Sequence, residues 1–186
     1  TVYLETLPLP KAVEKEITKF NPRGKLTNFN YTWKGDFDTP RDWSVKTNFN
    51  RLTIAEGVVT DGVGTPGCQT LTGEIFVSPL SGYLKLESGY SKLIFPGVFP
   101  NPQIGFISIK GNLDWVIEKN KPLTVKTSGL TFSNSDLTLT AVGSWKNTGG
   151  AGTIDLKATL DNVKAERTFV YLPYAVSLDT RAWLKA

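Results

Sequence analysis

Hydrophobic and polar residues alternate through the middle of the chain, from about residue 24 to residue 161. Examples are Tyr31 and Trp33 near the start of this region and Leu84 and Leu86 near its centre. A period of two is typical of strands with one apolar and one polar face. Threonine is plentiful among the polar positions, and it suits a half-exposed pleated surface. The pattern predicts a long series of strands.

Short turn signals separate the predicted strands. They lie at 34–36, 79–82, 118–122 and 147–152, and they are rich in Gly, Pro, Asn and Asp. Connections of this length are too short to hold crossover helices, so we expect consecutive strands to pair antiparallel, as in a meander.

Both ends of the chain have helical patterns instead. Leu9, Val13, Ile17 and Phe20 have the spacing of an amphipathic helix that stops at Asn21-Pro22-Arg23-Gly24. A second short helix is expected to end near Leu172-Pro173, and a third to begin after Ser177, a good N-cap residue. We therefore predict one β-dominated module with a helical lead-in (1–23), a curved and mainly antiparallel sheet (24–161) and a helical exit (162–186).

One stretch of 17 residues, Leu93 to Ile109, carries no charge. It is slightly short for a helical membrane span, and its prolines at 96, 100 and 102 would break such a helix. We read it as a strand "KLIF", an irregular connection "PGVFPNPQ" and a second strand "IGFISIKG". Val98 and Phe99 are expected at the edge or the end of the apolar face.

A long sheet with one apolar face must cover that face with helices or a second sheet, or leave it open as a groove or half-open barrel. Periodicity alone does not decide between an open groove and a closed core under the terminal helices. The in-phase apolar residues that would line a groove are Tyr31, Trp33, Val45, Phe49, Ile75, Leu84, Leu86, Ile107, Ile109, Leu113, Trp115, Leu137, Leu139, Ile154 and Leu156.

The composition of the chain limits the kinds of ligand and reaction that we expect. The chain of 186 residues carries a formal charge of +4, and its charges are spread along the sequence without the basic stripe that nucleic-acid binding requires. Histidine is absent, and Cys68 is the single cysteine. Because Cys68 lies in no nucleophile signature, we interpret it as a structural residue. No cofactor or metal is expected.

Acidic clusters do not point to catalysis. Asp36, Asp38 and Asp42 lie close together, but they lack the central glycine and distal glutamate of a calcium loop, so a hairpin turn explains them better. No spacing singles out a pair of carboxylates for glycoside hydrolysis. We therefore expect a protein without enzymatic activity.

Two other kinds of function stay open. Trp33, Trp115 and Trp145 would form a carbohydrate-binding platform if they were exposed and coplanar, although all three fall in strand phase with aliphatic residues. A purely structural scaffold would instead have a closed core and no cavity. The chain also begins without methionine and stops within "SLDTRAWLKA", which resembles a helix in progress, so we expect it to be a slice of a longer protein.

Four stretches together resemble one family. They are "LPLPKAVEKEITKFNPRGKLTNFNYTWKGD", "KLIFPGVFPNPQIGFISIKGNLDW", "LTFSNSDLTLTAVGSW" and "GTIDLKATLDNVKAERTFVYLP". Their order and spacing are similar to those of the YhdP family, large AsmA-like proteins of the Gram-negative cell envelope. The matching positions are Asn21, Pro22, Gly24, Leu26, Leu93, Pro96, Gly97, Phe99, Gly111, Leu113, Trp115, the segment Tyr171-Leu172-Pro173 and the segment from Thr180 to Leu184.

The resemblance implies a long periplasmic protein that an N-terminal helix outside this slice anchors in the inner membrane. It implies a β-sheet groove with an apolar interior, continued by neighbouring modules of the same chain. It also implies that phospholipid is the partner, carried between the inner and outer membranes without catalytic residues.

Overall fold

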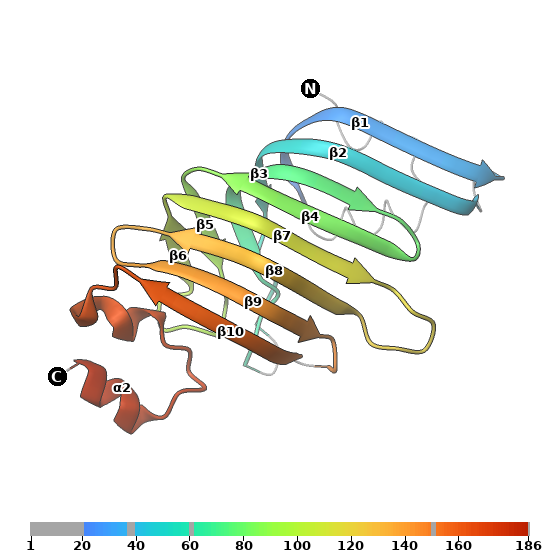
Figure 1. Cartoon of the computed structure of the whole chain (residues 1–186). Coiled ribbons are helices and arrows are strands. Elements are labelled where there is room, and N and C mark those ends of the chain that lie inside the picture. Colours follow the sequence, from blue (N-terminus) through green and yellow to red (C-terminus); the bar gives the residue numbers. More distant parts are fainter. Residues whose placement is uncertain (1–20, 37–39, 60–61, 150–151, 186) are drawn as a thin grey trace.

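The computed structural model describes residues 21–36, 40–59, 62–149 and 152–185 (Figure 1). The helix predicted near the N-terminus lies outside the described residues. The predicted β-dominated fold is confirmed, because ten strands form one sheet that stays open between its two edge strands. Its strands are β1 (Arg23–Gly35), β2 (Pro40–Ile54), β3 (Gly67–Val77), β4 (Ser81–Ser88), β5 (Ser91–Ile94), β6 (Gln103–Phe106), β7 (Ser108–Val116), β8 (Thr124–Ser133), β9 (Thr138–Lys146) and β10 (Thr153–Asp161).

The strands pair antiparallel in the order β1-β2-β3-β4-β7-β8-β9-β10. The turn predicted at the aspartate-rich segment is confirmed, since Gly35 of β1 pairs with Pro40 of β2 across it. The expected meander is correct except at the uncharged stretch. There β5 and β6 leave the path, and β4 pairs directly with β7.

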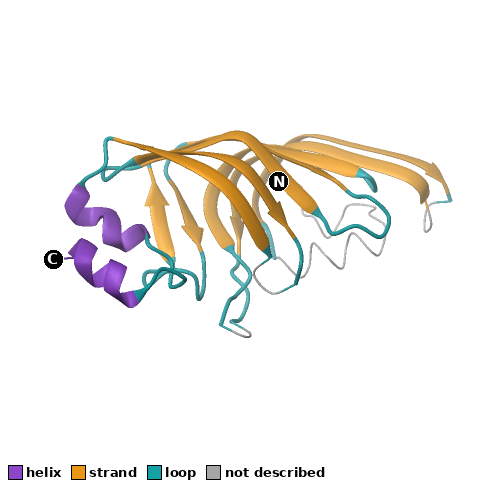
Figure 2. Ribbon diagram, turned by 60° about the horizontal axis from the view of Figure 1, so that its bottom comes forward, coloured by secondary structure: helices purple, strands orange, loops and turns teal. Residues whose placement is uncertain are grey.

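The uncharged stretch also departs from its predicted form. "KLIF" largely forms β5, but "IGFISIKG" is not one strand, because the chain breaks at Ile107 between β6 and β7. β5 pairs with the first residues of β3, and β6 pairs with β5. The hairpin therefore folds beneath the sheet instead of extending it, as Figure 2 shows at the end that carries the helices.

The sheet turns sharply at β1, β2 and β3. Asn28, Arg51 and Thr70 all have positive φ, and each lies at or beside an irregularity in strand pairing. A residue in this conformation bends its strand and increases the local twist. In β3 the bend separates the residues that pair with β5 from the residues that pair with β4. The bends thus allow one strand to serve both the sheet and the hairpin beneath it.

The main core lies between the sheet and the β5–β6 hairpin. Ile109 is fully buried at its centre, and Phe95 and Phe99 of the proline-rich connection pack against it from the edge. The buried members of the cluster are Phe49, Cys68, Leu71, Leu86, Ile104, Phe106, Ile109 and Leu130. Cys68 thus has the structural place expected of it, and burial raises the pKa of its thiol.

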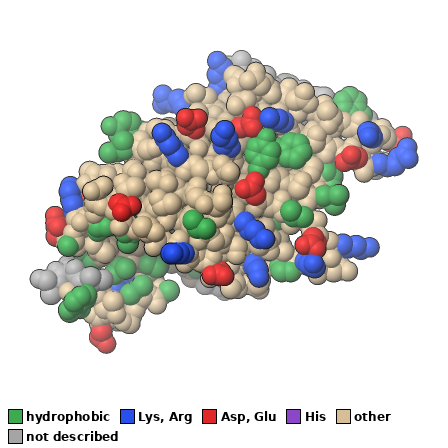
Figure 3. All heavy atoms as spheres, in the orientation of Figure 1, with side chains coloured by type: hydrophobic (Ala, Val, Ile, Leu, Met, Phe, Trp, Pro, Cys, Tyr) green, Lys and Arg blue, Asp and Glu red, His purple; other side chains and the backbone are tan. Residues whose placement is uncertain are grey.

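The opposite face of the sheet is polar. Lys46 forms an ion pair with Glu74 at 3.3 Å, and the Tyr83 hydroxyl donates a hydrogen bond to the same carboxylate at 2.8 Å. Figure 3 shows this side of the molecule, where basic and acidic side chains are interspersed. These exposed pairs stabilise the sheet only slightly.

Two short helices follow β10. The first, η2 (Ala165–Tyr171), is a 3₁₀ helix, and the second, α2 (Leu178–Lys185), is an α-helix. The predicted N-cap is confirmed, because the Ser177 hydroxyl accepts a hydrogen bond from the backbone N–H of Thr180. Both helices lie at the end of the sheet that carries the β5–β6 hairpin (Figures 1 and 2).

An acidic side chain connects these helices to the sheet. Asp136, in the turn between β8 and β9, accepts hydrogen bonds from the Tyr171 hydroxyl at 2.9 Å and from Arg167 Nε at 3.3 Å. The amide of Asn134 donates to the same Tyr171 oxygen at 2.9 Å. The Tyr171 and Arg167 contacts hold the pKa of the Asp136 carboxyl below its usual value. We call Asn134, Asp136, Arg167 and Tyr171 the Asp136 network.

Candidate functional site

One row of side chains crosses the sheet from edge to edge on its apolar face. The strand register places one residue from each of eight strands side by side in this row. Its members are Tyr31, Val45, Val77, Gly82, Trp115, Val125, Trp145 and Ile154. We call this set the aromatic row. Because side chains of directly paired residues lie on the same face, the row is a continuous apolar band.

The aromatic row depends on a glycine at its centre. A Cβ atom on Gly82 would lie only 2.2 Å from the indole of Trp115, its partner on β7. The indole therefore lies directly across the backbone of β4. Trp145 lies against the backbone of Gly152 in the same way. Aromatic rings that cover neighbouring glycines keep the sheet smooth where an ordinary side chain would stand up from it.

A second row runs parallel to the first, and several of its members are more deeply buried. It consists of Leu26, Phe49, Gly73, Leu86, Gly111, Leu130, Ala141 and Ala158, and we call it the buried row. Phe49, Leu86 and Leu130 in this row belong to the core under the β5–β6 hairpin. No member of the aromatic row belongs to that core. The apolar face thus has one covered half and one half outside the main core.

The structure brings most of the predicted lining residues onto one face. All but Ile107 and Leu137 lie within strands, and the register places those strand residues on the same side of the sheet. Leu137 comes directly before β9 and is buried. Ile107 lies outside the pattern, at the break between β6 and β7, where it is 46% exposed and lines a shallow pocket with Thr70 and Tyr90.

Burial divides the predicted lining residues further. Phe49, Leu86 and Ile109 are buried, and Ile75, Leu84 and Leu113 are half-buried against the same core. These residues fit the closed-core reading of the sequence. Trp33, Ile154 and Leu156 are half-exposed or more, and they lie on the two edge strands of the sheet. The exposed residues mark the two edges of the sheet, and the open groove stays a prediction.

The prediction missed some members of the aromatic row. Val77 and Val125 were not recognised because each lies near a strand end. Trp145 was named for a carbohydrate-binding platform but not among the lining residues. Beside the row, Trp43 pairs with Trp33. Tyr31 and Trp33 stack with their ring centroids 5.4 Å apart. Partial burial raises the pKa of the Tyr31 phenol. Pairing Trp43 with Trp33 across the hairpin would have been the signal for this aromatic cluster.

The described residues hold no group of three or more Cys, Asp or Glu side chains that could bind a metal ion. Asp36 is exposed at the β1–β2 turn, and Asp38 of the same cluster lies outside the described residues. The carboxyl groups with lowered pKa values, Glu74 and Asp136, have these shifts because neighbouring tyrosines, Tyr83 and Tyr171, donate hydrogen bonds to them. Each belongs to a structural contact at a different place on the sheet.

An open antiparallel sheet with one apolar face is the architecture that the sequence resemblance led us to expect. The model of the family described as YhdP protein matches residues 1–186. The chain therefore belongs to the YhdP family, AsmA-like proteins of the bacterial cell envelope. Comparison with curated proteins and with solved structures found no match. None of the helices in the described part of the chain is long and apolar enough to cross a membrane.

Proposed function

We propose that this chain is a non-enzymatic segment of a periplasmic lipid-transfer protein, and that the aromatic row shields phospholipid acyl chains from water. The observation that carries the proposal is the continuity of the row. Eight paired strands contribute to it, and it lies outside the main core of the protein. Membership of an envelope family supports the same conclusion.

The binding mechanism is passive. Each methylene that leaves water for the apolar face contributes roughly 0.8 kcal/mol, so two acyl chains are held stably without a specific polar anchor along the row. The flat indoles of Trp115 and Trp145 favour sliding, because they present no ridge that would fix one position of a chain. Charged side chains such as Lys46 and Glu74 lie on the opposite face, away from the lipid.

The row also suggests how segments are connected. It reaches both edge strands, through Tyr31 on β1 and Ile154 on β10. A neighbouring module of the same chain that pairs with either edge would extend the apolar band, so that lipid passes between modules. Attachment to the inner membrane is assigned to a helix outside these 186 residues. Nucleic acid is not a partner in this proposal.

Photo-crosslinking tests the proposal. A photoreactive phenylalanine derivative replaces Trp115 on the apolar face, and the control replaces Val116, the next residue of β7, which is 60% exposed on the polar face. The purified 186-residue chain is mixed with vesicles of phosphatidylethanolamine and phosphatidylglycerol, irradiated and analysed by mass spectrometry. We expect a phospholipid adduct at position 115 and none at position 116.

Two results would count against the proposal. Adducts at both positions would indicate non-specific contact with vesicles, and adducts at neither position would favour a structural scaffold. A carbohydrate-binding module is distinguished in the same experiment, because a soluble oligosaccharide would compete with its ligand at Trp115 but would leave a lipid adduct unchanged.

A further inference from the structure

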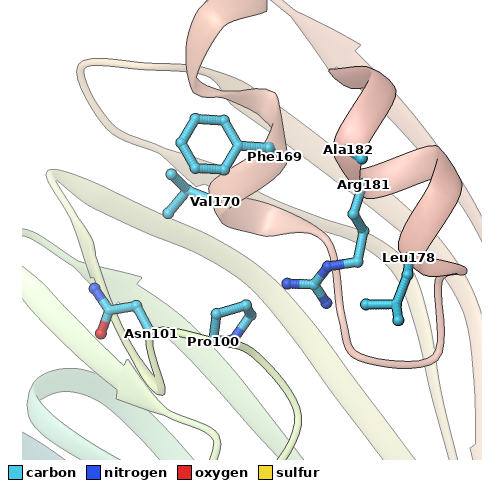
Figure 4. A pocket seen from close by; sticks show the side chains of 7 residues that line it. All are labelled: Pro100, Asn101, Phe169, Val170, Leu178, Arg181 and Ala182. Atoms are coloured by element: carbon cyan, nitrogen blue, oxygen red, sulfur yellow. The ribbon is translucent and has the colours of Figure 1, made fainter. Parts of the chain in front are cut away.

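A pocket of about 540 Å³ lies where the two C-terminal helices meet the proline-rich connection. Pro100 and Asn101 form one wall, η2 contributes Phe169 and Val170, and α2 contributes the rest. The residues from α2 are Leu178, Arg181 and Ala182. Figure 4 shows these side chains around the pocket. Apart from Asn101 and Arg181, the walls are apolar.

Among the described residues that line this pocket, Arg181 alone is charged. Figure 4 shows its guanidinium directed between Pro100 and Leu178, into the pocket. Its Nη1 atom is buried and has no hydrogen-bond partner among the described residues, and no described acidic side chain forms an ion pair with Arg181. The guanidinium lies over the ring of Tyr174, whose centroid is 5.1 Å from Cζ.

A buried N–H donor without an acceptor is costly, because it loses its hydrogen bonds to water and gains no hydrogen bond in return. A protein that keeps such a donor at an apolar pocket is suited to an anion that carries an apolar group. Phosphate is the favoured anion, since the planar guanidinium matches phosphate oxygens in a bidentate arrangement. The apolar walls then accommodate the carbon atoms next to the phosphate.

We infer that this pocket binds the phosphate group of an amphiphile, with Arg181 as the residue that recognises the charge. The inference rests on the proposed function and extends it, because the aromatic row contains no polar anchor for a headgroup. The pocket lies at the end of the sheet that carries the β5–β6 hairpin, so it would hold a headgroup at the covered end of the apolar face. It gives the C-terminal helices a role in binding.

The test uses calorimetry with three soluble probes on the 186-residue chain. Decyl phosphate has the anion and the apolar chain, decyl maltoside has a neutral headgroup on the same chain, and inorganic phosphate has the anion alone. The variant is Arg181→Gln, and the control is Lys119→Gln, which removes the same charge from the exposed β7–β8 loop. Circular dichroism confirms that both variants fold.

We expect Arg181→Gln to weaken binding of decyl phosphate about tenfold or more, the usual effect of losing a charge-assisted hydrogen bond. Lys119→Gln is expected to leave binding within about twofold, and decyl maltoside should bind all three proteins alike. The Nε–Hε resonance of Arg181 should shift on addition of decyl phosphate. If Arg181→Gln lost equal affinity for both decyl probes, or lost no affinity for decyl phosphate, the assignment of Arg181 as the phosphate-binding residue would be overturned. If inorganic phosphate bound as tightly as decyl phosphate, the apolar chain would not contribute to binding, and the assignment of an amphiphile as the ligand would be overturned.

This result is independent of the crosslinking at Trp115. A lipid adduct at position 115 together with unchanged decyl phosphate binding by Arg181→Gln would leave the proposed function standing and reject the Arg181 site. The absence of an adduct, together with Arg181-dependent binding of decyl phosphate, would reject the transfer function and retain the anion site.

Discussion

The buried row and the aromatic row are built from the same eight strands, yet only one of them became protein core. In the buried row, Phe49 and Leu86 are 3% and 7% exposed, whereas Val45 and Trp115 in the aromatic row are only half-buried. The difference comes from the β5–β6 hairpin, which packs over one end of the strands. A single apolar face can therefore be buried to different depths along the same strands.

The largest expected effect is the loss of a buried side chain in the covered half. Ile109→Ala should lower the free energy of unfolding by about 3 kcal/mol, because Ile109 is completely buried and its removal leaves a cavity. The matched variant Ile154→Ala, in the aromatic row, should cost less than about 1 kcal/mol. Urea denaturation measures both. Equal losses would mean that the aromatic row is also part of the core.

A second variant tests the smoothness of the aromatic row. Gly82→Val should cost about 2 kcal/mol, since its side chain would displace the indole of Trp115. The control is Gly105→Val in β6, where an added Cβ would have no atom within 4 Å. Thermal unfolding gives the stabilities, and a shift in tryptophan emission should appear only for Gly82→Val. An unchanged emission spectrum would show that the indole does not lie across Gly82.

The smallest effect is expected from the Asp136 network at the covered end. Asp136→Asn should cost about 1 kcal/mol at pH 7, because the carboxylate that accepts from Tyr171 and Arg167 becomes a weaker acceptor. The pKa of Asp136 is lower in the folded protein than in the unfolded chain. Its contribution is therefore present above about pH 4 and is lost as the pH falls through the folded pKa.

Urea denaturation of both proteins at pH 7 and at pH 3 checks this sign. The difference in the free energy of unfolding between wild type and Asp136→Asn should be smaller at pH 3 than at pH 7. If this difference were the same at both pH values, the stability of the Asp136 network would depend on hydrogen-bond geometry and not on the charge of the carboxylate.

The period-two pattern was sufficient to predict which residues share a face. It correctly grouped Tyr31, Val45 and Trp115, which lie on three different strands, because alternation fixes the side of the sheet whatever the strand order. It could not predict which part of the face is covered, since the cover comes from the pairing of β5 with β3, between residues more than 20 positions apart.

Local irregularities of the strands were the second kind of feature that the sequence did not predict. Arg51 and Thr70 have positive φ although neither is glycine, and nothing in their residue types marks a bend. The break at Ile107 interrupts a stretch that reads as one continuous apolar strand. Arg181 was overlooked because the role proposed for it depends on a pocket between the C-terminal helices and Pro100, a residue about 80 positions earlier in the chain.

The insertion of the β5–β6 hairpin between β4 and β7 also affects how the sheet assembles. Most neighbouring strands are joined by short turns, so their hairpins close quickly and locally. The pairing of Ser88 with Ile109 must instead enclose every residue from 89 to 108. Closing a longer loop costs more chain entropy, so we expect this junction to be the slowest step in folding. The two halves of the sheet, β1 to β4 and β7 to β10, would then form first and join last, when the β5–β6 hairpin packs against the sheet.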